Sequence, residues 1–262
     1  MESTDIMAFR FRSWMVASLP LLLLAVLALF LWKGAGDPVR TAPQPSIGES
    51  WIAFDLSKAA AADRIPGWDV RRGTYRISTG EDGKRVLEQL PEPMVEGKVL
   101  WTRAMRGGGA VRARMRGDRA RRAFPRFSVG LHQERELHLR ALPGERRLEL
   151  AACDPDLNNE VVLAGTPLPD WNWKPEDWLW LELRVLPDGD SWLCEGRLWR
   201  EGTERPEMPV LMHQMKLPAT VFFAALQGAP FALRPILIDA AETLPGGGRS
   251  SRGVFHSHGR WP

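Results

Sequence analysis

Two carboxylates, Glu145 and Glu149, are the closest approach in this sequence to a hydrolytic pair. Hydrolysis of a glycosidic bond uses two carboxyl groups that flank the bond, one as the acid and the other as the nucleophile or base. An alternating run of the type Glu-x-Asp-x-(x)-Glu would place such groups on one face of a strand. The sequence contains no run of this type. Glu145 and Glu149 are therefore interpreted as solvated strand positions.

Other reactive constellations are absent from the sequence as well. There is no Gly-x-Ser-x-Gly nucleophile turn, no glycine-rich phosphate loop, no Cys-x-x-Cys pair and no Cys-x-x-Cys-His haem motif. The two cysteines, Cys153 and Cys194, fall in expected strands, where they either stay free or form one bridge in an oxidising compartment. The sequence predicts no catalytic residue, no cofactor and no enzyme activity.

Metal-ligating residues occur, but not in convincing sets. The pair His256 and His258 lies in a Gly-rich tail without further ligands, and His132 and His138 are expected at surface or boundary positions of strands. One loop could offer oxygen ligands to calcium, although a plain polar turn is the simpler interpretation. Its residues are Asp154, Asp156, Asn158 and Asn159. No metal site is predicted.

Two groups of residues are candidates for partner or ligand contacts. Arg112, Arg114 and Arg116 alternate along one expected strand and share a face, within a stretch rich in arginine. This ridge would suit anionic lipid heads, an acidic partner or acidic glycans, or it is simply a solvated face. The net charge of +3 is too small to favour nucleic acid. Trp171 and Trp173, in a Pro-flanked loop, would suit a sugar ring or a protein interface.

The clearest element is N-terminal. Residues 14–32 carry no charge and would span roughly 28 Å as a helix, close to the thickness of a bilayer core. Trp14 and Trp32 mark its two ends, Arg10 and Arg12 precede it, and Lys33 follows it. We expect a single-pass anchor in the inner membrane, with residues 1–13 in the cytoplasm and the C-terminal domain in the periplasm. A cleaved signal peptide, with residues 34–36 as the cleavage site, is the alternative.

The rest of the 262-residue chain is predicted to be all-β. Residues 33–48 form a Pro/Gly linker, 49–243 one domain, and 244–262 a flexible Gly/Arg/His tail. Only residues 56–64 show a helical period. Short alternating segments predict a two-sheet antiparallel β-sandwich. The expected strands are residues 51–54, 75–78, 86–89, 99–102, 111–116, 127–132, 136–142, 145–152, 160–164, 179–185, 192–200, 221–226 and 233–238, with Pro235 at an edge or a bulge.

Several of these segments resemble a known family. Phe54, the runs at 66–68, 73–75 and 86–89, and the hairpin at 178–199 resemble laminin-G/concanavalin-A-like jelly rolls. The 3-keto-disaccharide hydrolase domain, which is similar to family-16 glycoside hydrolases, is the nearest of these. The resemblance covers roughly residues 50–240 and implies the fold more than an activity. Residues 154–177 depart from the family pattern and are expected to be an insertion.

The main functional hypothesis is therefore a non-catalytic accessory subunit of a larger membrane complex, possibly bioenergetic, whether photosynthetic or respiratory. Its partners would be the lipid bilayer and other subunits of that complex. The alternative is a cell-envelope domain that binds carbohydrate or hydrolyses 3-keto-glycosides, as the resemblance implies. A membrane-bound sensor fits less well, because residues 1–13 are too few for a signalling domain.

Overall fold

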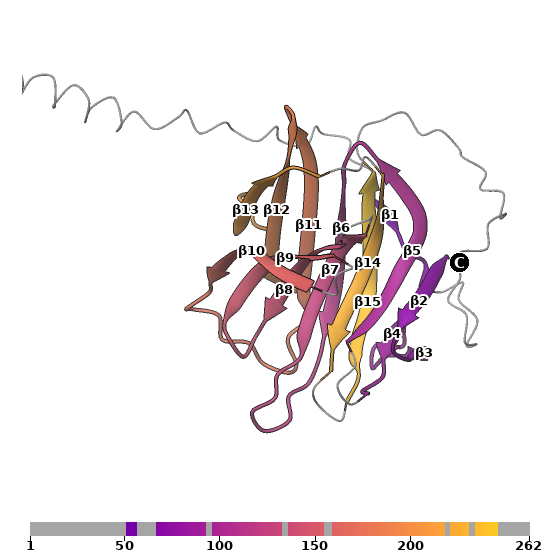
Figure 1. Ribbon diagram of the computed structural model, residues 1–262. Helices are drawn as coiled ribbons and strands as arrows, with labels where there is room; N and C mark the ends of the chain where they lie inside the picture. Colours follow the sequence, from indigo (N-terminus) through magenta and orange to yellow (C-terminus); the bar gives the residue numbers. More distant parts are fainter. Residues whose placement is uncertain are drawn as a thin grey trace, which may run out of the picture. The chain divides into compact units, whose positions relative to one another are not determined.

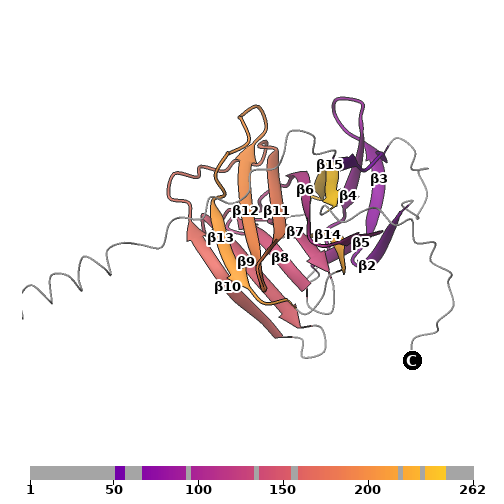
Figure 2. The same ribbon diagram turned by 90° about the horizontal axis from the view of Figure 1, so that it is seen from above.

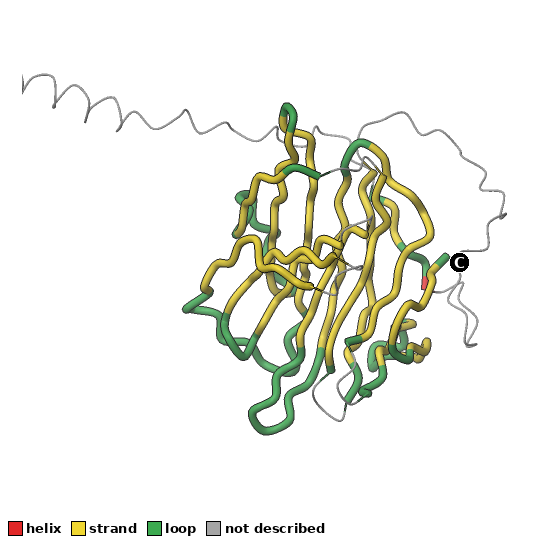
Figure 3. Tube along the Cα trace, in the orientation of Figure 1, coloured by secondary structure: helices red, strands yellow, loops and turns green. Residues whose placement is uncertain are grey.

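The computed structural model describes residues 51–56, 67–92, 96–132, 136–154, 159–217, 221–230 and 234–245. Most of this part of the chain is β-strand, and Figure 3 shows a single short helical turn at Leu56. No helix in the described ranges is long and apolar enough to cross a membrane. The predicted anchor at 14–32, the linker at 33–48 and the helical period at 57–64 lie outside these ranges, as does the tail beyond residue 245.

One sheet, sheet A, has eight strands. Its order is β13 (Leu211–Met215), β12 (Ser191–Arg200), β11 (Leu179–Asp188), β6 (Gly109–Arg116), β15 (Ile236–Pro245), β4 (Arg85–Gln89) and β3 (Tyr75–Thr79). The short strand β1 (Ile52–Ala53) pairs with the far end of β15. The pairings β11–β6 and β6–β15 join segments that are far apart in the chain.

The other sheet, sheet B, has seven strands. Its order is β10 (Asn159–Pro167), β9 (Arg147–Asp154), β8 (Glu136–Leu142), β7 (Arg126–His132), β14 (Val221–Ala229), β5 (Gly97–Arg106) and β2 (Trp68–Arg72). Strands β7 to β10 form a meander, whereas β14 enters between β7 and β5 from late in the sequence (Figure 1).

The two sheets form two layers, which Figure 2 shows from above. All paired strands are antiparallel. The predicted two-sheet antiparallel β-sandwich is confirmed.

Alternation along the strands explains how the core forms. On β6 the side chains of Val111, Ala113 and Met115 are at most 1% exposed and face sheet B, whereas the arginines between them point outward. Since successive side chains of a strand point to opposite faces, one apolar set per strand suffices to fill the space between the sheets. The layers approach so closely at Gly196 that an added Cβ would lie 2.5 Å from Leu139 Cδ1.

Three details differ from the sequence prediction. Pro235 precedes β15 and lies in neither an edge strand nor a bulge, because β15 is an inner strand with β6 and β4 beside it. Strands β2 and β13 were not predicted. Residues 154–177, expected as an insertion, include β10, which pairs along the whole of β9.

The two cysteines do not form a disulfide bridge. Cys194 is buried and belongs to the core between the sheets, whereas Cys153 is half-buried and lies in sheet B opposite Glu136 and Glu160. Both thiols are free, so the bridge that the sequence left open is excluded.

Candidate functional site

The segment at residues 168–178, between β10 and β11, crosses one end of sheet A. Its start is tied to the turn between β8 and β9, where the Leu168 N–H donates to the Arg146 carbonyl over 2.7 Å. Its far part is closed by a turn, in which the Lys174 N–H donates to Asp177 Oδ2 over 2.9 Å. These bonds hold the backbone of the segment in one course across the sheet.

Trp173 anchors this segment in the core. It is 8% exposed, and its ring centroid lies 5.9 Å from that of Phe124 and 6.3 Å from that of Phe127. A ring that is buried among aromatic neighbours cannot offer its face to a ligand or a partner. The expectation that Trp173 makes such a contact is therefore wrong, whereas Trp171, two residues earlier, is only half-buried.

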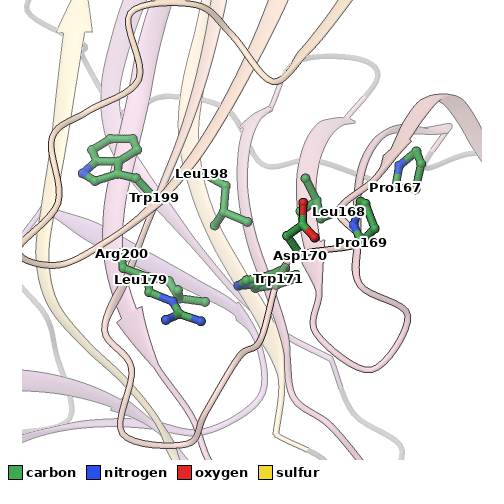
Figure 4. Close-up of a pocket in the computed structure, with 9 residues that line it drawn as sticks. All are labelled: Pro167, Leu168, Pro169, Asp170, Trp171, Leu179, Leu198, Trp199 and Arg200. Carbon is green, nitrogen blue, oxygen red and sulfur yellow. The ribbon is translucent and has the colours of Figure 1, made fainter.

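Beside Trp171 lies a groove with a volume of about 340 Å³. Residues 167–170 form one side, residues 198–200 the other, and Trp171 lies between them (Figure 4). Most of the lining is apolar, from Pro167, Leu168, Pro169, Leu179 and Leu198. Strand β13 pairs with β12 only as far as Gly196, which leaves the last residues of β12 open to this groove.

Two charged side chains of opposite sign border the groove. Arg200 Nη2 donates to the Asn172 carbonyl, and its Nε lies 3.5 Å from Asp177 Oδ2, so the guanidinium is held in place. Its Nη1 has no partner among the described residues. Asp170 is exposed and likewise has no partner within the described ranges. The groove thus combines an aromatic ring with one acceptor and one donor near its mouth.

This arrangement suits binding better than bond cleavage. A flat apolar ring can pack against Trp171 while hydroxyl groups at its edge bond to Asp170 and Arg200. Asp170 is the single carboxylate that lines the groove, whereas glycoside hydrolysis uses two. We therefore interpret the groove as a binding site for a polar ring.

The arginine ridge lies on the outer face of sheet A, and its charges are already paired. Arg112 binds Glu242, Arg114 binds Asp239 and Glu201, and Arg116 lies 3.2 Å from Glu81. These carboxylates come from distant parts of the chain, which the sequence pattern alone does not bring to mind. The ridge is a balanced ionic surface and offers little net attraction to anionic lipid or an acidic partner.

Tryptophan rings lie between these arginines. The Arg112 guanidinium lies 4.1 Å from the ring centroid of Trp51 and 5.4 Å from that of Trp180. Arg114 and Arg116 lie 5.3 Å and 5.1 Å from the ring centroid of Trp178. Contacts of this kind stabilise the face by cation–π attraction. Ring and guanidinium planes in alternation make the outer face of sheet A stiff.

A buried ionic network continues this face toward β12. Glu182 is fully buried and accepts hydrogen bonds from Arg184 Nε over 2.7 Å and from Arg205 Nε over 2.8 Å. Arg197 binds Glu195 over 2.8 Å and also donates to the Pro206 carbonyl. Burial alone would raise the pKa of Glu182, but its bonds to Arg205 and Arg184 outweigh it, so the pKa lies below its ordinary value of 4.5. The network fastens the loop at residues 201–210 over the sheet.

The outer face of sheet B carries a second polar cluster, which the sequence did not suggest. The Glu136 carboxylate contacts Lys98 and lies 3.1 Å from His132 Nδ1 and 3.4 Å from His138 Nε2. Burial, followed by the charge of Lys98, lowers the pKa of both histidines to about 4. Both rings are therefore neutral at neutral pH. His138 is only 4% exposed, so its expected surface or boundary position is wrong.

Glu149 is likewise buried, contrary to its interpretation as a solvated position. It is 5% exposed and binds Arg140 over 2.9 Å and Arg147 over 3.1 Å. Glu145 lies outside β9, in the exposed turn that precedes it. The two carboxylates are therefore in different environments, and the paired arginines occupy the one that is buried.

Metal ligands do not converge in the described ranges, where no three side chains of His, Cys, Asp or Glu are placed to hold an ion. Part of the possible calcium loop, including Asp156 and Asn158, lies outside those ranges, as do His256 and His258. The membrane-interface residues Trp14, Trp32, Arg10, Arg12 and Lys33 lie outside them too.

The sequence pointed to Trp171 but missed Asp170 and Arg200. Asp170 was visible as the acid directly before the aromatic loop residue. Arg200 ends a strand of the predicted hairpin, and nothing in the sequence shows that this end meets the loop at residues 167–171, because that meeting depends on the pairing of the sheets.

Comparison with known proteins gives no family match and no match among curated proteins. Among solved structures, the VIP36 exoplasmic/lumenal domain with bound Ca²⁺ and Man3GlcNAc is 10% identical, with a TM-score of 0.49 over 78% of this chain and 93% of that one. The carbohydrate-binding module CBM66 from Bacillus subtilis is 8% identical, with a TM-score of 0.42 over 68% of this chain and 92% of that one.

A family 16 glycosyl hydrolase from Mycobacterium smegmatis is 12% identical, with a TM-score of 0.43 over 74% of this chain and 100% of that one. Similarities at this level concern the fold and say nothing of ligand or activity. Within that limit, the neighbours are concanavalin-A/laminin-G-like jelly-roll domains of lectins, carbohydrate-binding modules and glycoside hydrolases, the fold class that the sequence resemblance implied.

Proposed function

We propose that this chain is a non-catalytic glycan-binding domain, held at the outer face of a membrane by its N-terminal helix. The observation that carries the proposal is the groove in which Trp171 lies between an unpartnered acceptor, Asp170, and a fixed donor, Arg200, within the described ranges. The proposal rests on these side chains and not on the similarity to lectins.

The chemistry of a sugar ring matches that of the groove. A pyranose has an apolar face of C–H groups, which packs against an indole, and a rim of hydroxyl groups that both donate and accept hydrogen bonds. Asp170 accepts from such hydroxyl groups, and Arg200 Nη1 donates to them. The volume of about 340 Å³ lies in the range of small-ligand sites.

The absence of a second carboxylate among the lining residues supports a role in binding rather than in hydrolysis. We expect the purified protein to release no product from glycosides or 3-keto-glycosides. Turnover of either substrate would overturn the non-catalytic part of the proposal while leaving the groove as its substrate site.

Replacement of Trp171 with alanine is expected to weaken glycan binding by more than about tenfold, because a central aromatic contact is removed. The full-length protein in mild detergent would be screened on an array of neutral oligosaccharides. The strongest ligand would then be titrated by calorimetry. Trp178→Ala is the matched control, since Trp178 is also half-buried but does not line the groove. Equal affinity of the Trp171→Ala protein would remove the groove as the binding site.

A second candidate function is that of an accessory subunit in a membrane complex. Of the five large hydrophobic side chains that are exposed in the described ranges, four lie near the free edges of β10 and β13. They are Val161 (51% exposed), Val162 (44%), Met208 (71%) and Met212 (46%). Exposed apolar side chains that gather at one edge are typical of protein contact sites.

If this edge binds another subunit, Val161→Thr together with Val162→Thr should reduce co-purification of partners from the native membrane. Threonine preserves the strand preference while reducing the apolar surface. The measurement is a mild-detergent pull-down of the full-length protein with quantitative mass spectrometry. The control is the single change Val70→Thr, at the exposed valine of β2. Recovery of the unmodified protein as a lone monomer would contradict the accessory-subunit function.

A further inference from the structure

A second pocket, of about 390 Å³, lies on the other flank of the segment at residues 168–178. It is formed by the ends of β6 and β15, the turn between β3 and β4, and Pro175 and Glu176 of the segment itself. Arg116, in this pocket, is one residue beyond Met115, which pairs with Leu179 in the first groove. Both pockets therefore lie at the same end of sheet A.

The lining of this pocket is charged, unlike that of the groove. Three carboxylates, Glu81, Asp118 and Glu176, face two guanidinium groups, those of Arg116 and Arg234. Arg116 lies 3.2 Å from Glu81, and Arg234 lies 3.1 Å from Asp118. Glu176 is exposed and has no partner in the described ranges. One negative charge is left over, so the pocket is complementary to a single positive charge.

The shape of the site selects the kind of cation. In the described ranges no three carboxylate or other ligand side chains converge closely enough to hold a metal ion. The carboxylates are instead spread around a cavity that is large enough for an organic group. An ammonium group has three donors and can bond to Glu176 while the rest of its molecule fills the pocket.

The two pockets are linked by one contact. Arg200, which lines the groove, lies 3.5 Å from Asp177, and Asp177 directly follows Glu176 of the second pocket. A ligand that is longer than one ring can therefore reach from Trp171 toward Glu176 along the same segment.

We propose that the second pocket binds the protonated amino group of an amino sugar in a glycan whose neighbouring ring packs on Trp171. The preferred ligands are then oligosaccharides with free, non-acetylated amino groups. This inference rests on the proposed function, since it names the class of glycan that the groove and the second pocket bind together.

The test compares two probes that differ only in acetylation, the β-1,4-linked tetramers of glucosamine and of N-acetylglucosamine. Both are titrated at mildly acidic pH into the full-length protein in mild detergent. The glucosamine tetramer should bind about fivefold more tightly, the size expected for one partly exposed ion pair. Glu176→Gln should abolish this preference without changing affinity for the acetylated tetramer. Glu204→Gln, at an exposed acid outside both pockets, should retain it.

Equal affinity for the two tetramers would overturn the inference, and so would a preference that survives Glu176→Gln. A preference that Trp171→Ala leaves undiminished in overall affinity would show that the two pockets do not share a ligand, which also overturns it. If neither tetramer binds while a neutral glycan on the array does, the inference fails and the proposed function stands. If no glycan binds at all, both fail.

Discussion

Replacing Trp173 with alanine is expected to lower the free energy of unfolding by about 3–5 kcal/mol, the range for truncation of a large buried aromatic side chain. The ring is 8% exposed and packs against Phe124 and Phe127, so its removal leaves a cavity between the segment and the core. Because Trp173 anchors residues 168–178, the same change should also weaken glycan binding. Urea denaturation of the full-length protein, followed by circular dichroism, measures the first effect, and calorimetry measures the second.

The matched control is Trp171→Ala, two residues away in the same segment. Its ring is half-buried and lines the groove, so this change should cost much less stability while it removes binding directly. The two variants therefore separate the anchor from the contact residue. If Trp173→Ala unfolded at the same urea concentration as the unmodified protein, the segment would not depend on this anchor.

The second large effect is expected at Glu182. Its change to glutamine keeps the shape of the side chain but removes a fully buried charge that binds Arg184 and Arg205. Loss of one partner from a buried ionic network leaves the other charges uncompensated, at a cost of about 3–5 kcal/mol. Urea denaturation at neutral pH measures this cost. Glu204→Gln, at an exposed acid of the same loop, is expected to change stability by less than about 0.5 kcal/mol.

The pH dependence gives this prediction a second measurement. Because the pKa of Glu182 is lower in the folded protein than its ordinary value of 4.5, its ionised form stabilises the fold above that pH. As the pH falls below about 4.5, the unfolded chain takes up this proton first and the stabilisation is lost. The unmodified protein and Glu182→Gln should therefore converge in stability in acid. A constant difference down to low pH would rule out the ionic explanation.

Local patterns sufficed for many strands. The alternation at residues 136–142 coincides with β8, and that at 111–116 lies within β6, because each strand has one face in the core. The Pro-Asp-Gly-Asp run predicted the turn between β11 and β12, which the pairing of Asp188 with Ser191 closes. The short strand β13 has apolar and polar residues without a clear signal, and it is a strand because β12 offers it an edge.

Long-range pairing is what the sequence did not show. Arg112 and Glu242 are partners because β6 and β15 are neighbours, and no local pattern specifies that neighbourhood. For this reason the arginines read as a free ridge in the sequence, although the fold neutralises them. The same holds for the groove, where Arg200 meets Trp171 only after β10, β11 and β12 have taken their places. Residue type predicted the aromatic contact, and topology supplied its charged companions.

The two-residue strand β1 has a mechanical consequence. Ile52 and Ala53 pair with Thr243 and Glu242 of β15, and the Phe54 N–H donates to the Ala241 carbonyl over 2.8 Å. A tension applied to the chain ahead of Ile52 is therefore transmitted to β15, an inner strand of sheet A with β6 along its other side. The load would enter the domain away from the free edges at β10 and β13, so a stretched tether need not peel the sandwich open from its rim.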